Sequence, residues 1–301
     1  MERFKTLLLR EWMQHQRGWL ILMLLPLVIT VVLGLFGQAH FDVDDDAGPI
    51  SGALPAALVL MAGLGAVTLL ICWGASLIQS PGLARRDSQD RSIEFWLSLP
   101  AGHLPSVGAT LLAHLLLLPW AALLVGTLGG LIASLPIIAK VFGFGAWFAL
   151  PWFGLLAAVA SLVLRLALGV LLATLWLSPL ILLTMAASAW FKRWGVPLVA
   201  GVLFIGGALL DRLYGNPVVW RLSRALAREA SMAFFAASRG EGGAALKITG
   251  GAGPALGTIP GWCLSDAASA LGALASPLFF GAIVVAIGGF ALLVLRRQRG
   301  A

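Results

Sequence analysis

The sequence predicts an all-α integral membrane protein with about six transmembrane helices, both termini cytoplasmic, and a short cytoplasmic helix between the second and third spans. Hydrophobic residues make up 60% of the chain and charged residues only 11%. The mean hydropathy of +0.96 lies far outside the range of soluble globular domains. No region resembles a separate soluble module, so residues 1–301 are expected to form a single transmembrane domain.

Six apolar runs are candidates for the spans. A helix needs about 17–25 mostly apolar residues to cross the hydrocarbon core, where each backbone polar group must be bonded within its own helix. The runs that meet this requirement are Trp19–Phe36, Leu54–Ile78, Val107–Leu131, Leu166–Trp190, Val196–Leu213 and Pro277–Leu295.

Lysine and arginine residues indicate the orientation. With both termini inside, the short outer loops carry one basic residue, Lys140, as the positive-inside rule requires. The net charge of +7 is scattered in short groups between apolar runs, which argues against nucleic-acid binding and for membrane anchoring. The inner groups are Arg3, Lys5, Arg10 and Arg17; Arg85, Arg86 and Arg91; Lys192 and Arg193; and Arg296, Arg297 and Arg299.

Three segments outside the spans have expected roles. Residues 1–17 place Phe4, Leu8 and Trp12 at helical spacing, which predicts an amphipathic helix on the membrane surface. Residues 141–165 are expected to re-enter from the outer side, the alternative being a seventh span that would put a basic group outside. Residues 214–276 are expected to form a long outer loop.

Motifs for catalysis are missing. The sequence has no Gly-Lys dipeptide, so it lacks the phosphate-binding P-loop, and it has neither H-E-x-x-H nor G-x-S-x-G. The chain is therefore expected to be no enzyme and to bind no cofactor of its own.

Metal ligation is not predicted either. His15, His40, His103 and His114 are dispersed without ligand spacing. The acidic residues at 42–46 fit only the first positions of a calcium-binding loop, which favours a solvated loop.

The positions of the acidic residues argue against an ion-coupled carrier. All thirteen Asp and Glu residues lie outside the six runs or at their ends, whereas such carriers usually need an ionisable group within the membrane. His114 and Arg165 come closest, and Arg165 is expected to extend toward the outer interface.

Two glycines in the third span, Gly126 and Gly130, have the four-residue spacing that permits close helix approach. Packing within the chain and contact with a second chain are both compatible with this spacing.

Residues 80–105 form the segment with the most specific pattern. Asp87 or Ser88 can cap a short helix that ends before Pro100, with Trp96 on its apolar face and Arg91 and Glu94 on another. Such a helix either rests on the membrane surface or receives motion from a soluble partner.

Within this segment, the run from Asp90 to Pro100, D-R-S-I-E-F-W-L-S-L-P, resembles the D-R-S-I-x-F-W-x-S-L-P signature of bacterial ABC-2 type permeases. Weaker similarities follow in the same order along nearly the whole chain, at Leu9–Trp12, at Ser188–Arg193 and from Ser276 to Arg297. The sequence departs from the family pattern at Glu94, Leu97 and His103.

The resemblance implies a membrane subunit of an ATP-binding-cassette transporter in the bacterial inner membrane. Two permease chains, identical or paired, would bind two ATPase subunits that carry the ATP and Mg²⁺. The residues implied in docking the ATPase are Arg86, Asp90, Arg91, Glu94 and Trp96.

Two other functions remain open from the residues alone. The chain could be a scaffold or sensor whose cytoplasmic helix recruits a partner without moving a substrate. It could also be an ion-coupled secondary carrier, which the missing carboxylate disfavours.

Overall fold

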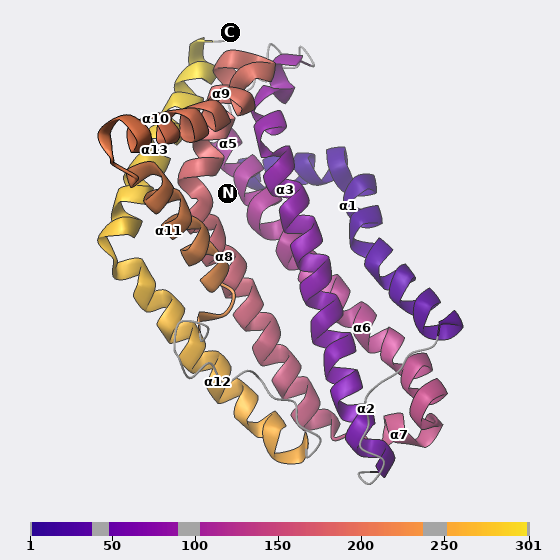
Figure 1. The fold of residues 1–301 in the computed structure, drawn as a ribbon. Helices are drawn as coiled ribbons and strands as arrows, with labels where there is room; N and C mark the ends of the chain where they lie inside the picture. The colour runs from indigo at the N-terminus through magenta and orange to yellow at the C-terminus, as the bar shows by residue number, and fades with distance from the viewer. Residues whose placement is uncertain (1, 38–47, 90–102, 237–251, 300–301) are drawn as a thin grey trace.

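The computed structural model describes residues 2–37, 48–89, 103–236 and 252–299, and these residues form helices joined by short turns, without a strand (Figure 1). This confirms the all-α class. The longer elements are α1 (Glu2–Phe36), α2 (Gly48–Leu58), α3 (Leu64–Gln89), α5 (His103–Leu112), α6 (Leu118–Phe142), α8 (Trp152–Phe191), α11 (Val218–Met232), α12 (Ala252–Gly272) and α13 (Pro277–Arg299).

Several helices continue through a wider π-helical turn. The turn η2 (Val59–Gly63) joins α2 to α3, and η3 (Ala113–Leu117) joins α5 to α6. A third such turn, η5 (Val202–Gly206), joins α9 (Gly195–Gly201) to α10 (Gly207–Tyr214). Each therefore inserts a local widening into an otherwise continuous apolar helix.

Five helical stretches among the described residues are long and apolar enough to cross a membrane: Phe4–Phe36, Gly52–Arg85, His103–Phe142, Trp152–Tyr214 and Pro277–Arg299. All six runs predicted from the sequence lie inside these stretches. The fourth and fifth runs share one of them, so the structure supports a multi-pass membrane protein.

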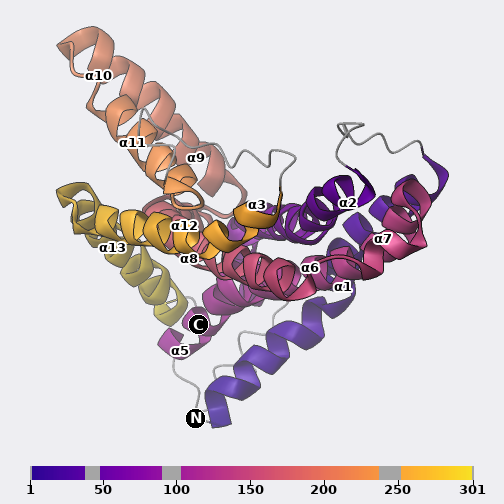
Figure 2. The ribbon, with the colours of Figure 1, turned by 90° about the horizontal axis from the view of Figure 1, so that it is seen from below.

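The expected fifth span is arranged differently from the others. The chain turns sharply after α8, where Lys192 adopts a positive φ of 54° and the short helix η4 (Lys192–Trp194) leads into α9. Gly195 lies against the backbone of Ser188, where a side chain would clash. Figures 1 and 2 show α9 and α10 extending sideways from the end of the bundle, with α11 returning beside α10.

The N-terminal helix α1 changes direction along its length. Figure 1 shows the start of α1 lying across one end of the bundle before the helix turns along it. Phe4 and Trp12, on the expected apolar face, are exposed at 36% and 38%, whereas Leu7 and Trp19 are buried against the bundle. The face of α1 that contacts the protein is therefore offset from the apolar face predicted for the membrane surface.

The segments expected to re-enter the membrane and to form a long outer loop are largely helical where the structure describes them. Residues 141–165 form the end of α6, the short helix α7 (Phe144–Phe148) and the first part of α8, which continues unbroken to Phe191. At 1.5 Å per residue, the 40 residues of α8 extend about 60 Å, roughly twice the hydrocarbon thickness. Residues 214–276 include α11 and α12, and α12 and α13 pack in succession along α8 (Figure 1).

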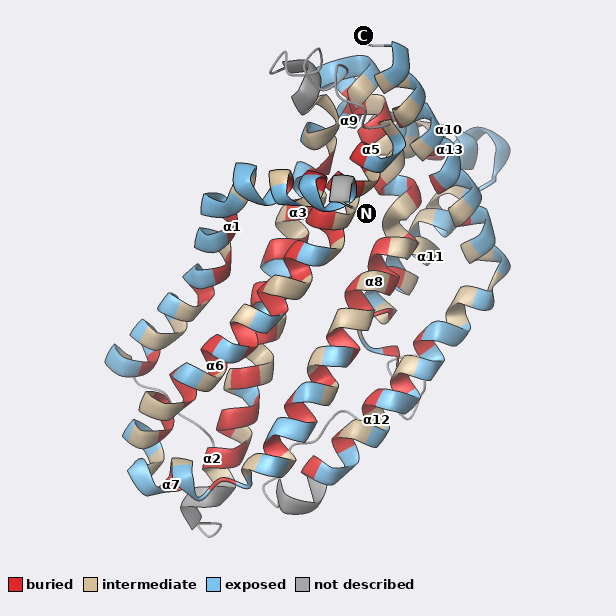
Figure 3. Ribbon diagram, turned by 180° about the vertical axis from the view of Figure 1, so that it is seen from behind, coloured by how far each residue is buried: buried red, intermediate tan, exposed pale blue. Residues whose placement is uncertain are grey.

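The core lies between α3, α6 and α8, while α1 and α13 expose most of their outer faces (Figure 3). Gly126 and Gly130 of α6 face Gly65 of α3 and Met61 of η2, at distances that leave no room for a side chain. The glycine pair expected from the sequence thus packs two helices of the same chain.

Candidate functional site

The residues expected to dock an ATPase lie mostly outside the described residues. Asp90, Arg91, Glu94 and Trp96 belong to the segment 90–102, and Arg86 lies in the last turns of α3. The helices on either side, α3 and α5, end and begin at the same end of the bundle as the C-terminus (Figure 1).

A buried polar cluster lies where the start of α1 crosses α5 and η3. Leu7, Glu11, His15 and Trp19 recur every four residues, so they form one stripe along the inner face of α1. Glu11 is only 1% exposed. The stripe carries a carboxylate and an imidazole into the bundle at positions that would otherwise be apolar.

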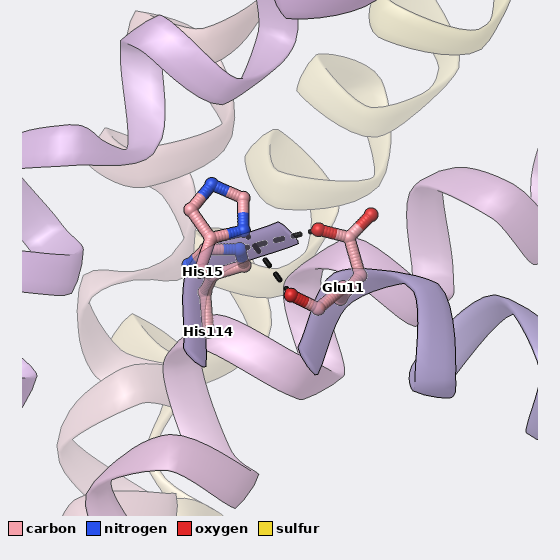
Figure 4. Close-up of side chains that lie close together, drawn as sticks. All are labelled: Glu11, His15 and His114. Carbon is pink, nitrogen blue, oxygen red and sulfur yellow. Dashed lines mark hydrogen bonds and ion pairs between the residues drawn. The ribbon is translucent and has the colours of Figure 1, made fainter. Parts of the chain in front are cut away.

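The two carboxylate oxygens of Glu11 have different partners. Figure 4 shows the carboxylate beside His15 and His114. Oε1 accepts hydrogen bonds from Arg10 Nη2 at 2.7 Å and from Thr110 Oγ1 at 3.0 Å. Oε2 faces His114 Nε2 at 3.3 Å. This last contact is longer than the 2.7–2.9 Å or so typical of a charge-assisted N–H···O⁻ bond.

Aromatic rings enclose His114. Its ring stands nearly perpendicular to His15 at 4.9 Å and to Trp19 at 5.1 Å between centroids. His15 stacks on Trp19 and donates from Nδ1 to the backbone oxygen of Glu11 at 3.2 Å. His114 Nδ1 is buried and has no hydrogen-bond partner in the described part of the chain.

The π-helical turn η3 sets the position of this histidine. His114 is the second residue of η3, directly after α5, which carries Thr110. A π turn adds one residue to a helical turn and shifts the side chains that follow around the axis. Such turns occur frequently at functional sites, and here one brings His114 and Thr110 to the same carboxylate.

A second buried cluster joins α8 to α12. The guanidinium of Arg165 binds Asp266 Oδ2 through Nε at 2.7 Å and approaches it with Nη2 at 2.6 Å. Nη1 donates to the backbone oxygen of Ala233, just after α11, and the Ala236 N–H donates to the same aspartate oxygen at 3.1 Å. Both charged side chains are only 1% exposed.

These clusters bear on two expectations from the sequence. Arg165 does not extend toward an interface, because it is paired inside the bundle. Glu11 and Asp266 lie outside the six predicted runs, as expected, but their carboxylates are both buried in the bundle. Buried charges need partners, and here each carboxylate has one from an element far away in sequence.

The sequence offered one signal for the first cluster. Glu11 and His15 are four residues apart in a helix, which places them on one face. His114, from a helix about one hundred residues later, completes the group. One carboxylate oxygen and one nitrogen of each imidazole lie within 4.8 Å of one another. Two imidazoles and a carboxylate can hold a proton or ligate a transition metal.

Comparisons with known proteins identify no family for this chain. No family model, no curated protein and no solved structure matches it.

Proposed function

We propose that the chain is the membrane-spanning permease subunit of an ATP-binding-cassette transporter of the bacterial inner membrane, powered by a separate ATPase. One observation carries the proposal. The run D-R-S-I-E-F-W-L-S-L-P, from Asp90 to Pro100, resembles the ABC-2 permease signature and joins the second and third apolar stretches.

The distribution of charge supports this assignment. Lys192 and Arg193 lie between α8 and α9, and Arg296, Arg297 and Arg299 end α13, all near the end of the bundle where α3 stops (Figure 1). At the opposite end of the described bundle, Lys140 donates to backbone oxygens at the end of α1. By the positive-inside rule, the signature segment would face the cytoplasm, where an ATPase would dock.

The packing suggests how a docked ATPase would act. In the sequence, the signature segment lies between α3 and α5, and α3 packs closely against both α6 and α8. A push on this segment would therefore act on the central helices of the bundle. ATP can drive transport only if the ATPase makes different contacts with the inward-open and outward-open states. Arg91, Glu94 and Trp96 are the proposed contacts, the charges for complementarity and Trp96 as an apolar anchor.

An ion-coupled carrier is a second candidate, because the structure buries two carboxylates in the bundle. Glu11 beside His114 is a group that could take up and release a proton. Gradient-driven uptake by this chain alone, reconstituted without any ATPase, would favour the carrier over the permease.

The permease assignment is tested by purifying the protein from native membranes in mild detergent and identifying its partners by mass spectrometry. We expect a soluble chain with a P-loop to be recovered in an amount nearly equal to that of the membrane protein. Its recovery should fall when Arg91 and Trp96 are both changed to alanine, and should persist when the exposed Leu213 of α10 is changed to alanine. Recovery of no P-loop chain, under conditions that preserve a known transporter from the same membranes, would contradict the assignment.

A further inference from the structure

We propose that Glu11, His15 and His114 form a binding site for a divalent transition metal of the zinc class, which fastens the start of α1 to η3. The proposal goes beyond permease function and rests on the cluster alone. Two histidines and one carboxylate are a common zinc donor set, and they leave one position open for water or another ligand. Imidazole ligands favour zinc and its neighbours over Mg²⁺ and Ca²⁺, which prefer oxygen.

The spacing of one pair of donor atoms fits a metal. Two ligands bound at about 2.0–2.1 Å to a tetrahedral zinc lie about 3.3–3.4 Å apart. Glu11 Oε2 and His114 Nε2 are separated by 3.3 Å. All three donor atoms fall within 4.8 Å of one another, so His15 has to come closer by about 1.5 Å at most to reach the spacing of a tetrahedral zinc.

The surroundings of Glu11 hold its carboxylate in place. Arg10 and Thr110 both bind Oε1, while Oε2 is the oxygen that faces His114. Hydrogen bonds to the other atoms of a ligating carboxylate are a general feature of metal sites, because they fix its orientation. The positive charge of Arg10 also opposes a second cation, so a tightly bound metal would need both imidazoles.

His114 contributes a second buried donor to the site, since it is only 1% exposed. A metal bound at Nε2 requires the remaining ring proton of His114 to lie on Nδ1, and a protonated imidazole must release one proton to solvent on binding. Metal affinity should therefore weaken as the pH falls.

The test uses full-length protein, purified in detergent without a histidine tag and stripped with a chelator. Zinc chloride is titrated calorimetrically, and cobalt binding is followed by its visible absorption. We expect one metal per chain in the wild type. His15→Gln and His114→Gln should each weaken binding at least about tenfold, since even partners behind the ligands contribute that much. The control His103→Gln, at the half-buried first residue of α5, should bind as the wild type does.

Thermal unfolding without metal establishes whether each variant is folded. If either variant fails to fold, X-ray absorption at the zinc edge of the wild type decides, because two imidazole nitrogens and one oxygen at about 2.0–2.1 Å are expected. The proposal is overturned if the wild type binds neither metal at 100-fold excess, if binding survives both substitutions, or if the absorption spectrum lacks imidazole. None of these results bears on the ATPase partner.

Discussion

The ion pair between Arg165 and Asp266 should contribute strongly to the stability of the bundle, because it joins α8 to α12. Changing Asp266 to alanine removes the acceptor of the Arg165 guanidinium and of the Ala236 N–H, and it leaves a buried arginine without its counter-ion. Breaking a buried pair on one side destabilises a protein by about 3–5 kcal/mol. For 301 residues, an unfolding entropy of about 2.1 cal/mol/K per residue makes 1 kcal/mol correspond to about 1.6 °C in Tm. We therefore expect Asp266→Ala to lower Tm by about 5–8 °C.

The assay is thermal unfolding of the purified protein in detergent, followed by circular dichroism. Asp211→Ala is the matched control, because Asp211 lies exposed on α10 and should leave Tm unchanged. A double variant, Arg165→Met with Asp266→Leu, should recover much of the loss, since an apolar pair of similar volume avoids the unpaired charge. A single variant that unfolds within 1 °C or so of the wild type would refute the role assigned to this pair.

Two further predictions concern docking and helix packing. Arg91→Glu should reverse the charge presented to the ATPase and uncouple ATP hydrolysis from transport, while the protein still reaches the membrane. Reconstituted ATPase and transport assays measure this coupling, and coupling as in the wild type would argue against docking through Arg91. Gly130→Ala should destabilise the protein, because its side chain would meet the backbone of η2, whereas Gly288→Ala on the open face of α13 should be neutral or slightly stabilising. If the two variants unfold at the same temperature, Gly130 is not needed for the close packing of α6 against η2.

The helices that form the bundle were predictable from composition alone. The predicted runs Trp19–Phe36 and Pro277–Leu295 lie within α1 and α13, because a long uncharged apolar run has no soluble alternative. Gly126 and Gly130 were also recognisable, since small residues at this spacing mark close helix contacts. The sequence left open which helix they contact, and the structure assigns them to α3 and η2 of the same chain.

The helix α12 within the expected long loop was not foreseen from the sequence. Residues 252–272 contain several glycines and two prolines, Pro254 and Pro260, which lower their helix propensity. They form α12 because packing along α8 stabilises a helix that intrinsic preference does not. Asp266 lies in this helix, which is why its carboxylate appeared to belong to a loop.

The buried cluster at Glu11 was hidden for a different reason. Glu11 belongs to a charged stretch that begins the chain, where a surface position is the ordinary expectation. Its partners Thr110 and His114 come from a helix about one hundred residues away and are aligned by a π turn. Spacing along the chain reveals groups on one element, and it cannot reveal a group that assembles across two.

The proposed docking of an ATPase by residues 90–100 can be tested by cross-linking in living cells. A photo-reactive amino acid replaces Trp96, and the products are identified by mass spectrometry after irradiation. The same substitution at Leu213, exposed on α10, serves as the control. We expect position 96 to capture a P-loop ATPase and position 213 not to do so. Capture from position 96 of lipid alone, or of proteins without a P-loop, would contradict it.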